Sequence, residues 1–423
     1  MNRREFVKNA AFASAGTLAL SNSRLFAAGS QKMKVALVGC GGRGKGALEN
    51  FIEAAKHLDV EVEIVGLADF FKFRTDEAVK KFAVSEDLCV TGPDAYKEIM
   101  KTDADVVILV TPPNFRPIHF EAAVNAGKHV FIEKPVAVDP PGARKIMETG
   151  EVAKQKGLAV VAGTQRRHQL EYLTTKYAID KGAIGAIRGG AVYWCMGALW
   201  NKERNPGEDD ASYMVRNWVS FAEMSGDHIV EQHVHQLDVA NWFIGRPPQM
   251  AIGFGGRARR KTGNQFDSFN IDFDYGQGVH IHSMCRQVNG CYDRVSEFFT
   301  GADGATWGSG PGKKEGETFA RQIKVPDFPN AGNPYVQEHV DLIDGILKGK
   351  PLNEAYNVGS STLTGIMGRI SAYTGQLVRW KDLTENEQSP WYNLTLTPTA
   401  MDFENGTVKA PVDDIVPIPG SMS

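Results

Sequence analysis

The sequence is poor in cysteine and has no strong excess of charge of either sign. Its five cysteines are widely spaced and form no C-x-x-C pair, which argues against a zinc ribbon and a disulfide scaffold. Lysine and arginine number 47 against 50 aspartates and glutamates, so the net charge of −3 provides no positive field for nucleic acid. Internal repeats and low-complexity blocks are also missing. Hydrophobic and charged residues, at 42% and 23%, lie near globular values, and 423 residues predict two or three domains.

The N-terminus has an apolar stretch, but a weak one. Arg3 and Arg4 precede this uncharged stretch over residues 9–23, and a small-residue site follows. The stretch is too short and too polar to span a membrane, and no cysteine precedes Cys40 to carry a lipid anchor. The arrangement resembles a twin-arginine signal peptide over residues 1–31, which predicts export of the folded chain to the periplasm. An ordinary basic amphipathic N-terminus is the alternative.

A dinucleotide-binding pattern begins at residue 34. The apolar run over residues 34–39 is typical of a buried parallel strand, and it leads into G-C-G-G-R-G. In such a motif the first glycine allows a tight turn, the second lets the backbone approach a pyrophosphate, and the third lets the helix pack on the strand. The N-terminus of that helix faces the phosphates. We therefore expect the loop to bind a dinucleotide through Gly39, Gly41, Gly42, Arg43 and Gly44.

A second strand, expected over residues 60–68, ends at Asp69. A carboxylate there accepts hydrogen bonds from the ribose hydroxyls of NAD and repels the 2′-phosphate of NADP. Asp69 lies 25 residues after Gly44, slightly beyond the usual spacing, which a long first helix would explain. NAD is the expected cofactor, and the nearby Arg74 leaves NADP as the less favoured one.

Strands and helices continue to alternate beyond this unit. Apolar strand patterns over residues 105–110, 129–133 and 158–162 are separated by helical patterns over 119–126 and 140–156. Such alternation is typical of a parallel, doubly wound sheet. The fold class is therefore α/β, with a Rossmann domain expected over residues 32–165.

Three motifs at strand ends resemble those of the Gfo/Idh/MocA oxidoreductases, which include glucose–fructose oxidoreductase and inositol dehydrogenase. They are G-C-G-G-R-G at residues 39–44, T-P-P-N at 111–114 and E-K-P at 133–135, and the resemblance extends over about residues 32–380. It implies a C-terminal α/β domain with a large, mostly antiparallel open sheet. It also implies that the side chains against the cofactor include Thr111, Pro112, Asn114, Glu133 and Gln165.

The resemblance places Lys134, the lysine of E-K-P, beside the nicotinamide and in contact with the reacting hydroxyl. The residue type suits that chemistry. A carbinol gives up a hydride only if its proton is also removed, and a cation beside the developing alkoxide stabilises it. A surface lysine in a β–α turn is the alternative interpretation.

The second half of the chain has a different pattern. Alternating strands are expected over residues 188–196 and 295–299, with a hairpin over residues 270–286. They indicate a mostly antiparallel sheet within residues 166–380, which in the family covers the nicotinamide end and often serves in oligomerisation. We therefore expect a homo-oligomer that forms through this sheet. Residues 381–423 are expected to be an irregular tail.

One helix, expected to run unbroken from residue 226 to residue 245, carries several titratable side chains. At 3.6 residues per turn, one of its faces holds His228, Glu231, His235 and Asp238. Many family members carry D-x-G-x-H-x-x-D here, and alignment places His235 at the catalytic histidine and Glu231 at the first aspartate. We assign His235 as the base that takes the hydroxyl proton and Glu231 as a second catalytic group. There are two alternatives: a metal site, which could also include His233, and a cluster of histidines packed in the core. No metal is expected.

Aromatic and polar residues near this helix suit a carbohydrate substrate, although ordinary core tryptophan is the alternative. The residues assigned to the substrate are Arg216, Trp218 and Asp238. The sequence thus predicts a periplasmic oxidoreductase that oxidises a sugar or glycoside hydroxyl, at C3 by analogy, with tightly bound and internally recycled NAD. The alternative is a glycoside hydrolase that uses NAD transiently with no net redox. Neither nucleic acid nor a stable membrane anchor is expected as a partner.

Overall fold

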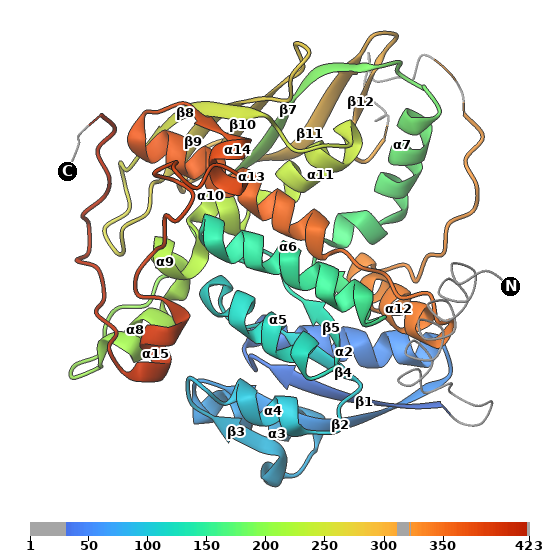
Figure 1. Ribbon diagram of the computed structural model, residues 1–423, viewed down its shortest axis with the longest axis vertical. Helices are drawn as coiled ribbons and strands as arrows, with labels where there is room; N and C mark the ends of the chain where they lie inside the picture. Colours follow the sequence, from blue (N-terminus) through green and yellow to red (C-terminus); the bar gives the residue numbers. More distant parts are fainter. Residues whose placement is uncertain (1–30, 311–320, 322, 421–423) are drawn as a thin grey trace, which may run out of the picture.

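The computed structural model describes residues 31–310, 321 and 323–420. The predicted signal peptide, residues 1–31, lies outside the described residues except for its last position. Among the described residues, no helix has both the length and the apolar content needed to cross a bilayer. Two β-sheets organise this part of the chain, one towards each end of the longest axis (Figure 1).

The N-terminal sheet is parallel, with the strand order β3-β2-β1-β4-β5-β6, as predicted for a doubly wound domain. Its strands are β1 (Gln31–Val38), β2 (Val60–Asp69), β3 (Cys89–Thr91), β4 (Val106–Leu109), β5 (His129–Ile132) and β6 (Val160–Ala162). The helices between them are α2 (Gly42–His57), α3 (Lys72–Phe82), α4 (Tyr96–Lys101), α5 (Arg116–Asn125) and α6 (Pro140–Gln155). All four positions of β4 are buried, which explains why this strand is continuously apolar.

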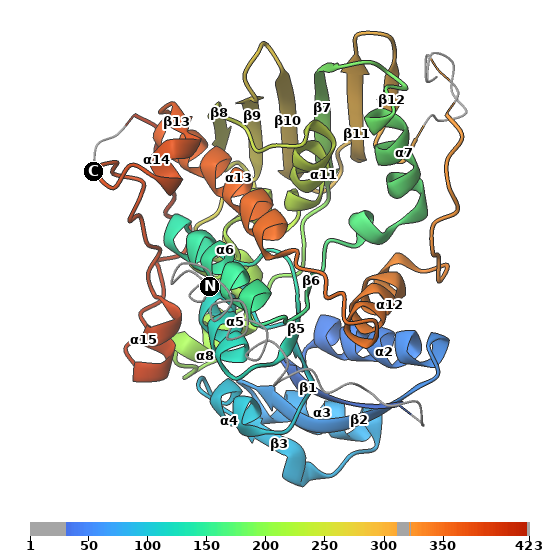
Figure 2. The same cartoon turned by 45° about the vertical axis from the view of Figure 1, so that its right-hand side comes forward.

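The C-terminal sheet has the strand order β12-β11-β7-β10-β9-β8-β13; β7 and β10 pair in parallel and the other neighbours are antiparallel. Its strands are β7 (Ile187–Met196), β8 (Met250–Gly256), β9 (Ser268–Asp274), β10 (His280–Gln287), β11 (Arg294–Gly301), β12 (Ala305–Trp307) and β13 (Val378–Arg379). The predicted hairpin is confirmed as β9 and β10. The helices α11 (Val234–Ile244) and α13 (Ala355–Thr374) cover one face (Figure 2). The opposite face exposes Ile252 and Phe254.

The chain returns to the N-terminal domain after completing most of the second sheet. The helix α12 (Pro334–Leu347) packs on α2, and its Val336, Leu342 and Ile343 belong to a core cluster with residues of the first sheet. The expectation that residues 166–380 form one second domain is therefore corrected. The apolar side chains of α12 pack against buried side chains of α2, so α12 covers the N-terminal domain.

The prediction of an irregular tail over residues 381–423 is wrong in part. The tail includes most of α14 (Trp380–Thr384) and all of α15 (Ala400–Asn405). The side chains of Thr399 and Asp402 cap the first turn of α15 reciprocally, and the helix ends at Gly406, which has a φ of 68°. The remaining α-helices are α7 (Leu170–Asp180), α8 (Asp210–Arg216), α9 (Ala222–Ser225) and α10 (His228–Glu231).

Candidate active site

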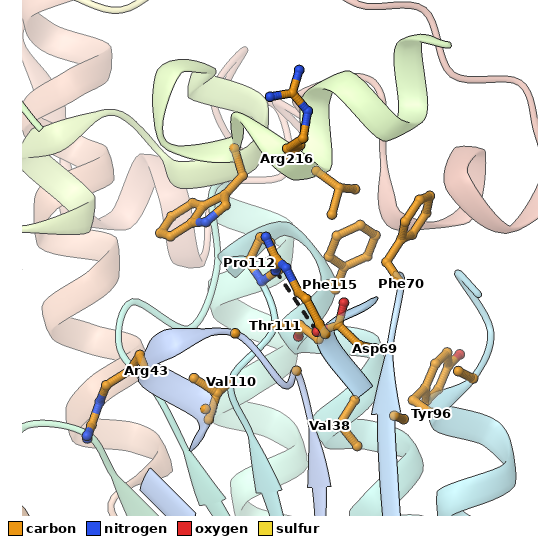
Figure 3. A pocket seen from close by; sticks show the side chains of 18 of the residues that line it. Val38, Arg43, Asp69, Phe70, Tyr96, Val110, Thr111, Pro112, Phe115 and Arg216 are labelled. Carbon is orange, nitrogen blue, oxygen red and sulfur yellow. Dashed lines mark ion pairs between the residues drawn. The ribbon is translucent and has the colours of Figure 1, made fainter. Parts of the chain in front are cut away.

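A cleft of about 780 Å³ opens at the carboxyl ends of β1, β2 and β4 (Figure 3). Doubly wound sheets bind ligands at this edge, where successive connections leave in opposite directions. The second half of the chain closes the cleft from the opposite side. The lining residues on that side are Trp200, Lys202, Val215, Arg216 and Trp218.

The glycine loop forms the floor of the cleft, and glycine is required at two of its positions. Gly39 has a φ of 100°, and a Cβ there would lie 2.6 Å from the carbonyl carbon of Val110. A Cβ at Gly44 would lie 1.7 Å from the backbone oxygen of Gly39. The positive φ of Gly39 agrees with the predicted tight turn, and the approach at Gly44 agrees with the predicted packing of the helix, whereas the approach of Gly39 to the end of β4 was not predicted. The helix α2 begins at Gly42, so its free amides face the cleft.

Asp69 lines the cleft at the end of β2 and is almost completely buried. Its Oδ2 accepts a hydrogen bond of 2.7 Å from the amide of Cys40, and its Oδ1 accepts one of 3.0 Å from the amide of Phe71. A guanidinium nitrogen of Arg74 lies 4.0 Å from Oδ2. Burial raises the pKa of Asp69, and Arg74 and the backbone donors oppose that shift. Asp69 therefore fixes the glycine loop as well as facing the cleft.

The residues of T-P-P-N do not all face the cleft. Thr111 and Pro112 line it, as the family resemblance implies. The Asn114 amide instead donates hydrogen bonds to the backbone oxygens of Glu223, at 2.7 Å, and Pro398, at 3.0 Å. Asn114 is not among the residues that line the cleft, and its amide joins three parts of the chain.

The charged groups of Arg43 and Glu133, both predicted to bind the cofactor, contact each other, and Arg43 lines the cleft. The backbone of Arg43 belongs to the loop, but its guanidinium points away from the cavity (Figure 3). It pairs with Glu133 at 2.5 Å and with Glu338 of α12 at 3.1 Å. Burial opposes ionisation of Glu133, but the charge of Arg43 prevails and lowers its pKa. The pair therefore ties the glycine loop to the strand end that carries Lys134.

Lys134 and Glu231 lie together, as expected for members of one site. The Nζ of Lys134 donates a hydrogen bond of 2.6 Å to the backbone oxygen of Glu231 and lies 3.2 Å from its Oε1. Both side chains are about 13–14% exposed, so the ion pair is screened little by water. The Oε2 of Glu231 is buried and has no hydrogen-bond partner among the described residues.

The predicted continuous helix over residues 226–245 is wrong, because the chain turns at Gln232 and His233 between α10 and α11. The amide of His233 bonds to the backbone oxygen of His228, five residues back, which interrupts the α-helical ladder. The helix face that was expected to hold the titratable side chains is consequently divided between α10 and α11. His228 pairs with Asp227 at 3.0 Å.

His235 follows the break and is buried beside Trp194. The two rings stack, with centroids 5.7 Å apart and an angle of 25° between the planes. Burial lowers the pKa of His235 well below its usual value, and the charge of Lys134 adds to the effect. His235 is therefore a neutral imidazole at physiological pH, as a proton acceptor must be.

The alternative of a metal site gains no support from the described residues, in which no group of three or more potential ligands is arranged around one point. The Nε2 of His233 lies 2.7 Å from the Oγ of Ser283. That histidine is fully buried, and burial lowers its pKa to about 3. His228 and His233 are thus core histidines, in agreement with the packing interpretation for these two positions.

Arg216 and Asp238, both predicted to bind the substrate, have protein partners in the structure. The guanidinium of Arg216 pairs with Glu208 at 2.5 Å and points away from the cavity (Figure 3). Asp238 is buried and accepts hydrogen bonds from Arg167 and from the hydroxyl of Ser361. Each charge already has a partner that the sequence pattern did not indicate.

Trp218 lines the same cleft as Asp69, so the structure places it with the candidate cofactor residues. Its ring meets that of Trp200 edge to face, at 6.2 Å. Gln165 lies outside this cleft lining, and its amide nitrogen is 3.3 Å from the hydroxyl of Tyr335 in α12.

Several aromatic residues of the cleft escaped the sequence analysis. Phe70, Tyr96 and Phe115 line it near Asp69. Phe70 directly follows Asp69, and Phe115 directly follows T-P-P-N, so their positions after strand ends were a usable signal. Tyr96 lies on α4, a short helix that the sequence analysis did not anticipate.

Two family descriptions match the chain. Residues 33–164 match the oxidoreductase family with an NAD-binding Rossmann fold, and residues 172–304 match the GFO/IDH/MocA C-terminal domain. An inositol 2-dehydrogenase of Rhizobium meliloti is 25% identical over 207 residues, which are 48% of this chain and 56% of that protein. A scyllo-inositol 2-dehydrogenase (NAD(+)) of Bacillus subtilis is 23% identical over 237 residues, or 54% and 62%. The chain spans about half the length of the curated relatives it matches.

Solved structures with the same fold are matched over nearly their whole length. A levoglucosan dehydrogenase in complex with NADH and levoglucosan has a TM-score of 0.65 and 17% identity, covering 82% of this chain and 99% of that one. A myo-inositol 2-dehydrogenase of Lactobacillus plantarum has a TM-score of 0.62 and 20% identity, with the same coverage. At these identities the likeness establishes the fold alone.

Proposed function

The chain belongs to the Gfo/Idh/MocA family of oxidoreductases, and we propose that it oxidises a hydroxyl group of a sugar or polyol to a ketone with NAD as the hydride acceptor. The observation that carries the proposal is the contact between Lys134 and Glu231, with the buried His235 close enough for the charge of Lys134 to help lower its pKa. The family membership and the dehydrogenases among its relatives support the same reaction class.

The cleft fits a dinucleotide, and NAD would supply the acceptor for the hydride. Gly39, Gly41 and Gly44 leave room for a pyrophosphate beside the N-terminus of α2, and Asp69 faces the same cavity. A buried carboxylate in this position favours NAD over NADP. Arg74, 4.0 Å away, reduces that preference because its charge attracts a 2′-phosphate.

The protein side of the reaction is a proton transfer. The substrate hydroxyl gives its proton to an imidazole nitrogen of His235, which is neutral and therefore able to accept it. The ammonium group of Lys134 stabilises the alkoxide that develops as the proton leaves. Glu231 holds the ammonium in place through its backbone oxygen and its carboxylate. The electron pair of the carbinol C–H bond leaves as hydride, so a carbonyl group remains.

The finer parts of the proposal rest on the N-terminal sequence and on the cleft. The twin arginine at positions 3 and 4 supports export of a folded, loaded protein to the periplasm. A periplasm offers little free NAD, so we propose that the cofactor stays bound and that a keto-sugar substrate reoxidises it in place. Oxidation at C3 of a glycoside is proposed by analogy with secreted family members.

A homo-oligomer through the open face of the C-terminal sheet is proposed as well. Ile252 and Phe254 are 52% and 67% exposed there, and large apolar side chains on one sheet face are typical of an interface. Light scattering of the purified protein measures the oligomeric state. A monomer at micromolar concentration would exclude this part of the proposal.

The redox-neutral glycoside hydrolase remains the second candidate because of one observation. It needs a base near C2 besides His235, and the buried Oε2 of Glu231 has no hydrogen-bond partner among the described residues. Oxidation, elimination of the aglycone, addition of water and reduction would then leave NAD unchanged overall.

Incubation with a panel of polyols, free sugars and glycosides distinguishes the two functions. A dehydrogenase converts the alcohol to a ketone and raises the absorbance of NADH, whereas the hydrolase releases a reducing sugar with no lasting change in NADH. In these assays Lys134→Ala is expected to lose activity, and Lys154→Ala is its matched control because this lysine is exposed on α6. A protein that neither reduces NAD nor releases sugar across the panel contradicts the proposed function.

A further inference from the structure

The C-terminal tail packs behind the walls of the cleft near Asp69, and residues 396–414 are here called the strap. We propose that the strap holds the two domains together at this end and thereby slows the release of a bound dinucleotide. The inference rests on the proposed function, because it assigns the dinucleotide to this cleft. Figures 1 and 2 both show α15, the helix of the strap, beside α8.

A carboxylate of the strap binds the N-terminal domain directly. Glu404 accepts a hydrogen bond of 2.9 Å from the hydroxyl of Tyr96 and pairs with Lys97. Its side chain is only 7% exposed. Tyr96 lines the cleft, and its ring stacks on His119, another lining residue, at 4.1 Å. The strap therefore contacts the wall of the cleft through a partly buried, charge-assisted hydrogen bond.

The apolar side of α15 packs behind the same wall. The ring of Phe403 meets the ring of Phe115 edge to face, with centroids 5.0 Å apart. Phe115 lines the cleft from the N-terminal domain, and Val215 lines it from α8. Phe403, Phe115 and Val215 belong to one buried cluster, so the strap joins the walls of the cleft that the two halves of the chain supply.

Backbone groups anchor the strap on both domains. Asn114 donates to the backbone oxygen of Pro398 in the strap and to that of Glu223 in α9. The amide of Ala410 donates a hydrogen bond of 2.9 Å to Asp210 at the start of α8. If the cleft opens at this end, these contacts break together, so the strap adds to the barrier for release. Slow release suits an enzyme whose cofactor is recycled without leaving.

The rate of dinucleotide release tests the proposal without any substrate. Wild type and variants are loaded with NADH and chased with excess NAD, and the decay of NADH fluorescence gives the release rate. Glu404→Gln and Lys97→Met remove the same ion pair from opposite sides, and each is expected to release NADH about tenfold faster. Glu387→Gln is the matched control, because Glu387 is exposed elsewhere in the tail and its variant should retain the wild-type rate.

Both variants are measured at least ten degrees below their own melting temperatures, so that unfolding does not contribute to release. The proposed role of the strap is wrong if both folded variants release NADH within twofold of the wild-type rate, or if Glu387→Gln accelerates the release equally. The proposed function fails separately. If the protein has no activity on the panel of alcohols and glycosides but its NADH release depends on Glu404, the proposed oxidoreductase function is wrong and the proposed role of the strap stands.

Discussion

The two ends of the candidate site are built on different principles. Near Asp69, the cleft is lined by glycine and aromatic residues and the strap packs behind its walls, so shape and apolar contact dominate. Near Lys134, the site is a group of charges, in which Glu231 holds the ammonium and the nearby His235 is kept neutral. The comparison indicates a division of labour, in which the first end retains the cofactor and the second performs the proton chemistry.

Replacing Lys134 with alanine is expected to have the largest effect, and only at the charged end. The variant loses the cation that stabilises the alkoxide, so we expect kcat on the best alcohol substrate to fall by about 10²–10⁴. NADH release should be unchanged, because Lys134 does not line the cleft near Asp69. Stopped-flow absorbance of NADH measures the first quantity and the fluorescence chase measures the second.

Lys154→Ala serves as the control for the removal of a lysine, and circular dichroism checks the fold of both variants. Turnover within threefold of wild type in Lys134→Ala would remove Lys134 from the mechanism. A loss of cofactor affinity equal to the loss of turnover would contradict the division between the two ends.

Asp69 tests the opposite end, with a smaller expected effect. Asp69→Ala should weaken the binding of NAD by about tenfold and the binding of NADP by less, because the carboxylate binds ribose hydroxyls and repels a 2′-phosphate. Asp69 also holds the amide of Cys40, so Asp69→Asn is needed as a variant that keeps the shape and one acceptor oxygen. Isothermal titration with each nucleotide measures the affinities. Equal weakening of NAD and NADP in Asp69→Ala would mean that the residue acts only on the loop, and tighter wild-type binding of NADP would reverse its interpretation.

The cofactor end was the more predictable from sequence, because its requirements are local. The positive φ of Gly39 and the approach of Gly44 to its backbone lie within a single turn, and the acidic residue ends the next strand. A short motif contains this information, but not the approach of Gly39 to Val110 at the end of β4. Lys134 was predictable for the same reason, since its position depends on the end of one strand and not on distant pairing.

The rest depends on contacts that no local pattern encodes. The side chains of Tyr96 and Glu404 are separated by 308 positions in the chain, and neither residue type indicates the other. The helical periodicity of residues 226–245 hid the break at Gln232, because an irregular turn of two residues leaves the apolar spacing almost intact. The ion pairs of Arg216 and Asp238 were not predicted, because a sequence does not show which residue pairs with a charged side chain.

A charged cluster that joins the late helices to the chain beyond β6 is expected to affect the stability of the fold and not the reaction. His168 lies 2.6 Å from Asp341 of α12 and 3.4 Å from Glu354, the residue before α13. Burial alone would lower the pKa of His168, but the Glu354 and Asp341 carboxylates together raise it to about 10. A histidine that is more basic in the folded state than in the unfolded state, where its pKa is about 6.5, stabilises the fold by binding a proton.

That stabilisation is complete below pH 6.5 and is lost as the pH rises through about 10. The free energy of unfolding should therefore differ most between wild type and His168→Gln near pH 6, and the difference should shrink steadily up to pH 10. Denaturant titrations at several pH values measure it. The accelerated release in Glu404→Gln should stay constant from pH 6 to pH 9, because Glu404 raises the pKa of its partner Lys97 above the usual value and the ammonium therefore keeps its charge over that range. A stability difference that does not change with pH would mean that His168 is neutral in the fold, and its carboxylate neighbours would then bind it by hydrogen bonds alone.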